Sequence, residues 1–145
     1  MTKKQVPTRS VYPIFRTIPT RWMDVDSYGH VNNVEYLSYF DTAVNGWYLE
    51  NDLIDMVSGN KIFLVVETNC TYFGEITFPD IVHAGIKVER IGNSSVTYDI
   101  ALFRNDTGAA CALGRFVHVL VDRESRKPTP LEDLHLKLFQ SAYDL

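Results

Sequence analysis

The segment Asp24-Val25-Asp26-Ser27-Tyr28-Gly29-His30-Val31-Asn32-Asn33 runs directly into the stretch NVEYLSYFDTAVNGWYLE, residues 33–50. In the second stretch, apolar and aromatic side chains recur every three or four residues, the spacing of one face of an α-helix. The residues of this stripe are Tyr36, Leu37, Phe40, Ala43, Val44, Trp47 and Tyr48. The stripe is wide, so we expect a largely buried helix. At about 1.5 Å per residue it is about 27 Å long, which favours a central element around which the chain wraps.

The start of this helix carries a capping pattern. Asn32 is placed as the N-cap, and Glu35 follows three residues later, as in a capping box. A helix start leaves backbone N–H groups without helical partners and carries partial positive charge. Such donors can hold the negative charge that develops on a carbonyl oxygen. Asn33 is the first residue after this cap.

Two carboxylates precede the helix. Asp24 and Asp26 lie two positions apart, so in an extended loop they point the same way. A carboxylate facing the helix start can attack a carbonyl or activate a water beside it. Gly29 permits the tight turn back to the helix, and His30 adds a group that titrates near neutral pH. Residues of these types are also ordinary in loops and caps, so the whole string carries the information.

The rest of the chain is rich in predicted strands. Runs of β-branched and aromatic residues between turn signals predict strands over residues 15–22, 61–73, 81–90, 95–103 and 109–121. Pro19 donates no backbone hydrogen bond, so the first strand should lie at an edge or be irregular. A capping box at residues 129–132, with Pro130 at the first helical position, predicts a last helix to about Ala142. One long helix beside a run of antiparallel strands indicates the α+β class, although strand order stays open.

Size and composition narrow the function classes. The 145 residues fit a single domain, residues 1–145, with residues 1–10 as a loose arm. The net charge is −4 and basic residues are scattered, so we expect no nucleic-acid binding. No apolar run approaches the roughly 18 residues that span a bilayer, and the N-terminus lacks the apolar stretch of a signal peptide. Cys70 and Cys111 lie in apolar runs without metal-ligand spacing, which predicts buried thiols, no metal site and a cytoplasmic location.

The string that opens the helix closely resembles the signature of hot-dog thioesterases related to 4-hydroxybenzoyl-CoA thioesterase. The matching residues are Arg21–Asp26, Gly29–Asn33, Tyr36-Leu37, Phe40-Asp41, Val65–Thr68, Tyr72, Asp80, Phe116–Val119, Val121-Asp122 and Lys127-Pro128. The resemblance covers about residues 15–131. It implies a five-stranded antiparallel sheet wrapped around the long helix. It also implies a homodimer or homotetramer in which sheets continue across the interface and the active sites lie between protomers.

The resemblance further implies hydrolysis of an acyl-CoA thioester to the free acid and the CoA thiol, with no cofactor. It places the catalytic carboxylate on Asp26, as nucleophile or general base, and the oxyanion-binding N–H on Asn33. The other candidates are His30 for catalysis, Tyr36 and Asn32 for substrate binding, and Asp24, Gly29 and Glu67 in supporting roles. Asp24 is expected to organise the loop by bonding backbone N–H groups. Glu67 is expected to be a paired, buried carboxylate.

Two other functions compete with hydrolysis. A hot-dog hydratase or dehydratase pairs His with a carboxylate, and one such motif places Asp and His five positions apart. Here Asp26 and His30 are four apart, and Asp24 and His30 are six apart, so the spacing does not match. The second competitor is a non-catalytic acyl-thioester binding protein, against which the presence of both Asp residues argues. An acyl-carrier protein could replace CoA as the thioester carrier, and the acyl-chain specificity is not readable from the residues.

Overall fold

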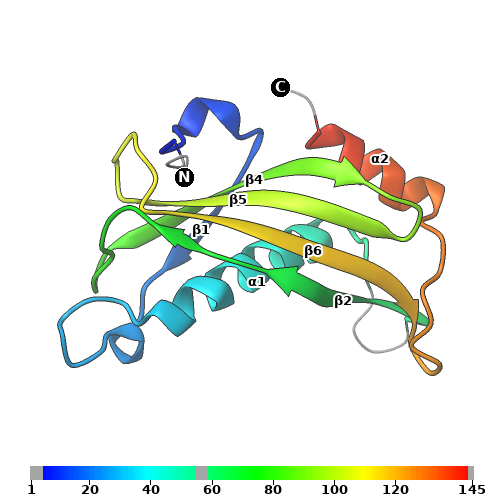
Figure 1. The fold of residues 1–145 in the computed structure, drawn as a ribbon, viewed down its shortest axis with the longest axis horizontal. Coiled ribbons are helices and arrows are strands. Elements are labelled where there is room, and N and C mark those ends of the chain that lie inside the picture. Colours follow the sequence, from blue (N-terminus) through cyan, green and yellow to red (C-terminus); the bar gives the residue numbers. More distant parts are fainter. Residues whose placement is uncertain (1–4, 55–58, 144–145) are drawn as a thin grey trace.

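The computed structural model describes residues 5–54 and 59–143 (Figure 1). Its elements are η1 (Arg9–Val11), β1 (Ile14–Pro19), η2 (Trp22–Asp24), α1 (Asn33–Glu50), β2 (Lys61–Thr68), β3 (Thr71–Tyr72), β4 (Ile81–Ile91), β5 (Ser95–Arg104), β6 (Ala112–Asp122) and α2 (Asp133–Ser141). The long helix has the expected bounds, and the order of elements confirms the α+β class. Among the described helices, none is long and apolar enough to cross a membrane.

All strands belong to one antiparallel sheet in the order β1-β4-β5-β6-β2, with β3 also paired to β6. β1 lies at an edge, as Pro19 predicted. The strand expected over residues 61–73 is divided into β2 and β3, because Asn69 interrupts it. The Asn69 N–H donates to the Arg115 carbonyl (3.1 Å), and its side-chain oxygen accepts the Arg115 N–H (3.0 Å). A side chain therefore replaces a backbone acceptor at the break, and the sheet gains a sixth short strand.

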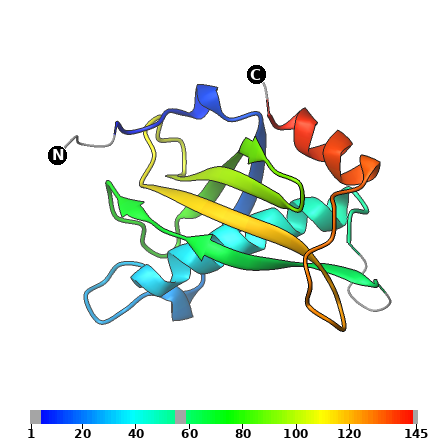
Figure 2. The same ribbon diagram turned by 45° about the vertical axis from the view of Figure 1, so that its right-hand side comes forward.

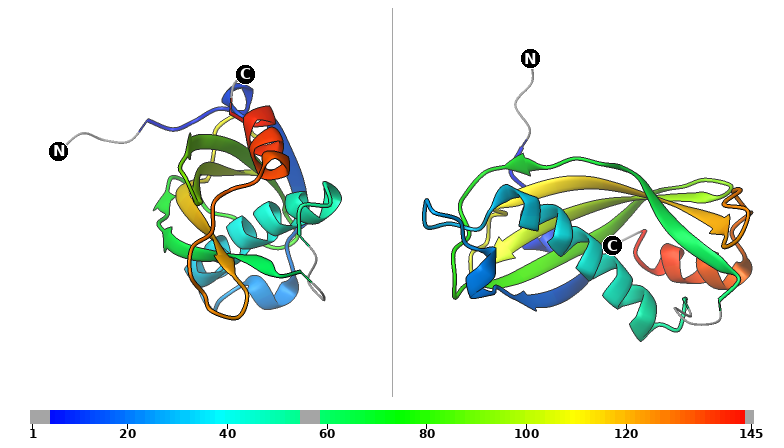
Figure 3. Two further views of the ribbon diagram at one scale, coloured as in Figure 1. Left: turned by 90° about the vertical axis from the view of Figure 1, so that its right-hand side faces the viewer. Right: turned by 90° about the horizontal axis from the view of Figure 1, so that it is seen from below.

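The sheet curls around α1, which crosses its concave face diagonally (Figure 3). The buried face of α1 consists of Tyr36, Tyr39, Phe40, Ala43, Val44, Trp47 and Tyr48. Phe40 sits directly over Gly114 of β6, where an added Cβ would lie 2.2 Å from the ring. Leu37 was expected in the buried stripe, but it is 37 % exposed. The core thus confirms a central helix wrapped by the sheet, the arrangement of a hot-dog domain.

The last helix, α2, begins at Asp133 rather than at the expected Pro130. The N–H groups of Thr129 and Leu131 donate to carbonyl oxygens of β6 and of the β4–β5 turn, each at 2.9 Å. These bonds hold the segment extended, so the Thr-Pro pattern cannot start a helix there. Glu132 is the N-cap instead. The helix packs at the end of the sheet where the β4–β5 turn lies (Figure 2).

The described part of the N-terminal arm is tied to the sheet, which corrects the expectation of a loose arm. Thr8 forms a β-bridge with Ala109 in the loop between β5 and β6. The Arg9 guanidinium donates to the Thr107 carbonyl oxygen (2.6 Å) and lies over the Phe103 ring. The arm therefore covers part of the outer face of the sheet.

Candidate active site

The loop before α1 is a closed turn. Val25 and Val31 form an antiparallel bridge, and the Asp26 N–H donates to the His30 carbonyl oxygen at 3.0 Å. The Gly29 N–H in turn donates to the Asp26 carbonyl oxygen at 3.2 Å. Gly29 has a φ of 87°, a backbone conformation that favours glycine. The expected tight turn at Gly29 is therefore confirmed.

The loop is fastened to the segment that precedes β4. The Val31 N–H donates to the Ile76 carbonyl oxygen (2.6 Å), and the Thr77 hydroxyl donates to the Gly29 carbonyl oxygen (2.8 Å). Thr77 lies far from the loop in sequence and carries no motif, so pattern analysis could not find this support. The turn is thus held rigidly at the helix start.

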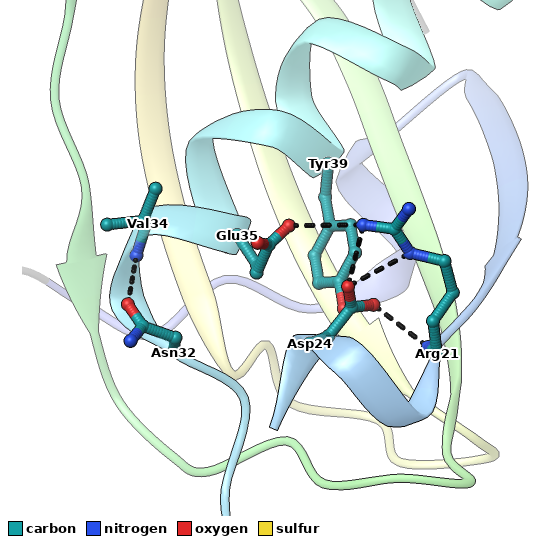
Figure 4. A network of polar contacts seen from close by, with 6 residues as sticks. All are labelled: Arg21, Asp24, Asn32, Val34, Glu35 and Tyr39. Atoms are coloured by element: carbon teal, nitrogen blue, oxygen red, sulfur yellow. Dashed lines mark hydrogen bonds and ion pairs between the residues drawn. The ribbon is translucent and has the colours of Figure 1, made fainter. Parts of the chain in front are cut away.

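The N-cap of α1 is Asn32, as expected: its side-chain oxygen accepts the Val34 N–H at 3.0 Å (Figure 4). The expected capping box does not form, because the Glu35 carboxylate reaches Arg21 instead (3.5 Å). The exposed Asn33 begins the helix, and its N–H has no acceptor within residues 5–54 and 59–143. One helix-start donor is therefore available to a ligand.

Asp24 is completely buried and forms the centre of a polar network (Figure 4). One carboxylate oxygen accepts the Nε–H of Arg21 (3.0 Å) and lies 2.8 Å from its Nη2. The other accepts the Arg21 backbone N–H (2.9 Å) and the Tyr39 hydroxyl (2.8 Å). Burial by itself raises the pKa of the Asp24 carboxyl, but the bonds from Arg21 and Tyr39 outweigh it and hold that pKa below its usual value.

Asp24 and Asp26 were expected to face the same space, but this network holds Asp24 away from Asp26. η2 turns Asp24 into the protein, so only Asp26 remains near the surface. Asp24 organises the loop, since its carboxylate binds a backbone N–H and its own carbonyl oxygen accepts the Asn32 N–H (2.8 Å). Arg21 and Tyr39 had been given no role. Arg21 stood inside the matching string, but Tyr39 lay outside the predicted apolar stripe.

The Asp26 side chain is 19 % exposed, and its two oxygens differ. One accepts the Tyr28 N–H at 2.9 Å, while the other lies 3.8 Å from Nδ1 of His30. The Tyr28 ring stacks on the His30 ring at a centroid distance of 6.3 Å. Beside Asp26 lies a hollow of about 400 Å³ whose walls include the exposed side chains of Trp22 and Phe78. The Asp26 oxygen that faces His30 therefore accepts no hydrogen bond from the described residues.

The structure places Tyr36 in the core and Glu67 at the surface. Tyr36 is 3 % exposed and packs edge-on against Tyr72 at 4.9 Å, so its position favours packing behind the helix start over contact with a substrate. Burial raises the pKa of Tyr36 to about 12. Glu67 is paired with Arg115 (3.7 Å) but its side chain is 54 % exposed. The expectation of a buried carboxylate was wrong, because β2 is an edge strand open to solvent there.

The cysteines form no disulfide, and only Cys111 is buried, whereas Cys70 is half-buried. Burial raises the pKa of the Cys111 thiol. Within the described part of the chain, no group of three or more His, Cys, Asp or Glu residues is arranged to hold a metal ion.

Residues 20–138 match the thioesterase-like superfamily. The chain belongs to this family, and the resemblance to hot-dog acyl-CoA thioesterases is confirmed.

Three relatives show how far the likeness extends. The crystal structure of the PA5185 protein from Pseudomonas aeruginosa strain PAO1 is 44 % identical, with a TM-score of 0.93 over 97 % of this chain and 98 % of that one. A thioesterase from Thermus thermophilus, complexed with coenzyme A and Zn, is 27 % identical, with a TM-score of 0.74 over 90 % and 95 % of the two chains. The uncharacterized protein YsmA of Bacillus subtilis (strain 168) is 27 % identical over 127 residues, 86 % of this chain and 84 % of its own. The family and these neighbours support a thioesterase activity in general.

Proposed function

We propose that this protein hydrolyses acyl-CoA thioesters at the start of α1, with Asp26 as the reacting carboxylate. The observation that carries the proposal is a partly exposed carboxylate in the loop that leads into α1, a helix whose first N–H lacks an acceptor among the described residues. The coenzyme A bound to the Thermus thioesterase supports CoA, rather than an acyl-carrier protein, as the thiol carrier.

In this mechanism the thioester carbonyl oxygen accepts the Asn33 N–H, and the helix dipole stabilises the charge that develops on it. The Asp26 oxygen nearer His30 either attacks the carbonyl carbon or takes a proton from an attacking water. In the first case an Asp26–acyl anhydride forms, the C–S bond breaks and CoA leaves as the thiolate, which then takes up a proton. Water hydrolyses the anhydride to the free acid and restores Asp26. A thiolate is a good leaving group, so neither path needs a strong general acid.

A second copy of the chain completes the site in this proposal. β2 is an edge strand, and its exposed side chains include Leu64, Val65 and Val66. A free edge with aliphatic side chains is a template for pairing with another strand. A two-fold axis beside Val65 and Val66 pairs β2 with its copy in antiparallel fashion. α1 begins beyond the far end of β2, where the Tyr72 hydroxyl donates to the Asn33 carbonyl oxygen (3.4 Å). The start of one β2 then lies beside the start of the partner's α1.

The Asp26→Asn variant tests the chemistry. It keeps the size of the side chain and removes the charge, so we expect kcat to fall at least about a thousandfold for every acyl-CoA in a panel of short, long and aromatic acyl groups. The measurement is release of free thiol. Ser27→Ala, an exposed neighbour in the same loop, is the control and should retain activity. Full hydrolysis by Asp26→Asn would sink the assignment. Parallel assays with acyl-carrier-protein thioesters decide the thiol carrier.

A further inference from the structure

A cavity of about 670 Å³ lies between the outer side of α1 and the first half of β2. Its apolar wall includes Leu49, Ile62, Phe63 and Val65. His118 of β6 also reaches this wall, although the residue as a whole is only 1 % exposed. The polar side chains that also line the cavity are Asp41, Thr42, Asn45, Lys61 and Arg123, and none of these is buried, so His118 is the one buried polar residue in this lining. An apolar wall with one buried imidazole has the form of a small-molecule pocket with a specific polar contact.

His118 belongs to a buried chain of hydrogen bonds. The hydroxyls of Tyr98 and Tyr48 are 2.8 Å apart, and the Tyr48 hydroxyl lies 2.9 Å from Nδ1 of His118. Both tyrosines are fully buried. Tyr48 is the one hydrogen-bond partner of the Tyr98 hydroxyl within the described residues. A buried hydroxyl proton without an acceptor costs about 1–3 kcal/mol, so Tyr98 donates to Tyr48 and Tyr48 donates to Nδ1.

This direction fixes the tautomer of His118. Nδ1 is the acceptor, so the ring proton is on Nε2. Burial lowers the pKa of His118 to about 4, which leaves the ring neutral at pH 7. Nε2 has no hydrogen-bond partner within residues 5–54 and 59–143. In this part of the chain, Thr129 Oγ1 is the one solvent-inaccessible side-chain N or O atom that lacks a partner, so Nε2 keeps some accessible surface. The N–H on Nε2 therefore reaches the cavity that His118 lines.

We propose that this cavity receives the acyl group and that the His118 Nε2–H donates a hydrogen bond to an uncharged oxygen, such as a keto oxygen, carried by that group. The preferred substrates are then oxygenated acyl thioesters rather than plain alkanoyl thioesters. This inference rests on the proposed function, including pairing along β2, which brings the start of one β2 beside the partner's α1. Among the other side-chain donors that line the cavity, the Asn45 amide donates to Asp41 (2.9 and 3.1 Å), Lys61 pairs with Glu132 (3.5 Å) and Arg123 donates to the Gly59 carbonyl oxygen (3.0 Å). Thr42, the remaining one, is exposed on α1.

The wild-type enzyme gives the first test. A medium-chain and a long-chain saturated acyl-CoA are each assayed beside analogues in which one CH₂ is replaced by C=O, moved one carbon at a time. We expect kcat/KM to peak at one ketone position, about tenfold above the saturated parent, because an unpaired buried donor then gains an acceptor. Equal kcat/KM for all members overturns the inference while leaving the thioesterase proposal intact. No hydrolysis of any member overturns the proposed function itself.

Variants of the buried chain locate the contact. His118→Phe removes the donor and should reduce the keto-to-saturated ratio of kcat/KM to about one, whereas His118→Gln, which keeps an N–H, should restore part of it. Tyr98→Phe is the matched control: it deletes a buried hydroxyl in the same cluster but leaves the bond from Tyr48 to His118. It should keep the wild-type ratio. A thermal melt checks that each variant is folded, and a folded His118→Phe with an unchanged ratio excludes His118 as the contact.

Discussion

Asp24 and Asp26 are only two positions apart in the sequence, but their surroundings are very different. The single turn of η2 carries Asp24 into the protein, where Arg21 and Tyr39 bind both of its oxygens. Asp26 stays in the turn, with one oxygen on a backbone N–H and the other towards His30. One carboxylate shapes the loop, and the other is left for the proposed reaction.

Asp24→Asn is expected to lower the free energy of unfolding by about 2 kcal/mol at pH 7, because it weakens hydrogen bonds to a buried charge. The pKa of Asp24 is lowered in the folded protein, so its charged form contributes stability above the unfolded pKa of about 4. That contribution disappears as the pH falls through the folded pKa. Urea unfolding at pH 7 and in the acid range should therefore show the gap between wild type and variant closing in acid. A gap independent of pH would show that the Asp24 charge contributes nothing.

Part of the candidate site could be predicted from the local conformational preferences of single residues. The Asn32 cap and the Gly29 turn follow from the conformational preferences of those residues and could be predicted. The partner of Glu35 could not be, since Arg21 approaches it only after the loop folds back onto the helix. The burial of Tyr39 has the same cause: its hydroxyl points to a carboxylate that sequence periodicity does not place.

At the scale of elements, the spacing of apolar residues predicted the bounds of an element correctly where the deciding interactions lie within that element. The helix over residues 33–50 was predicted correctly because its apolar stripe is continuous. The errors lie where a neighbouring strand supplies the decisive bond. Asn69 ends β2 by bonding Arg115, and Thr129 is held by the β6 backbone. No pattern within either segment contains that information.

Gly114→Ala tests the fit between α1 and β6. The new Cβ would lie 2.2 Å from the Phe40 ring and 2.7 Å from the Asn69 carbonyl oxygen, so the helix would have to lift from the sheet. We expect a loss of roughly 1–3 kcal/mol in the free energy of unfolding, measured with urea. Gly108→Ala, where an added Cβ has nothing within 4 Å, is the control. If both variants lost a similar free energy of unfolding, the loss would come from replacing any glycine and not from the contact between Gly114 and Phe40.

At the scale of the molecule, the two edges of the sheet are unequal. β1 contains Pro19, whereas β2 presents three consecutive exposed aliphatic residues, Leu64, Val65 and Val66. β2 also has an irregularity between Val65 and Glu67, and bulges can protect an edge from pairing. Protected edges usually combine such bulges with charged side chains, and the centre of β2 has none. The edge is therefore better suited to pairing with a second copy than to lying in water.

Val66→Asp tests this pairing together with the position of the active site. Val66 is 59 % exposed in one chain, and on a two-fold axis each protomer would bring the new charge against its copy. We expect the wild type to sediment as a dimer or larger assembly and the variant as a monomer, with at least about tenfold lower kcat/KM because the site lies between protomers. Val11→Asp, a second exposed valine in η1, should change neither property. A monomeric Val66→Asp with full activity would place the whole site within one chain, and a monomeric wild type would exclude the β2 interface altogether.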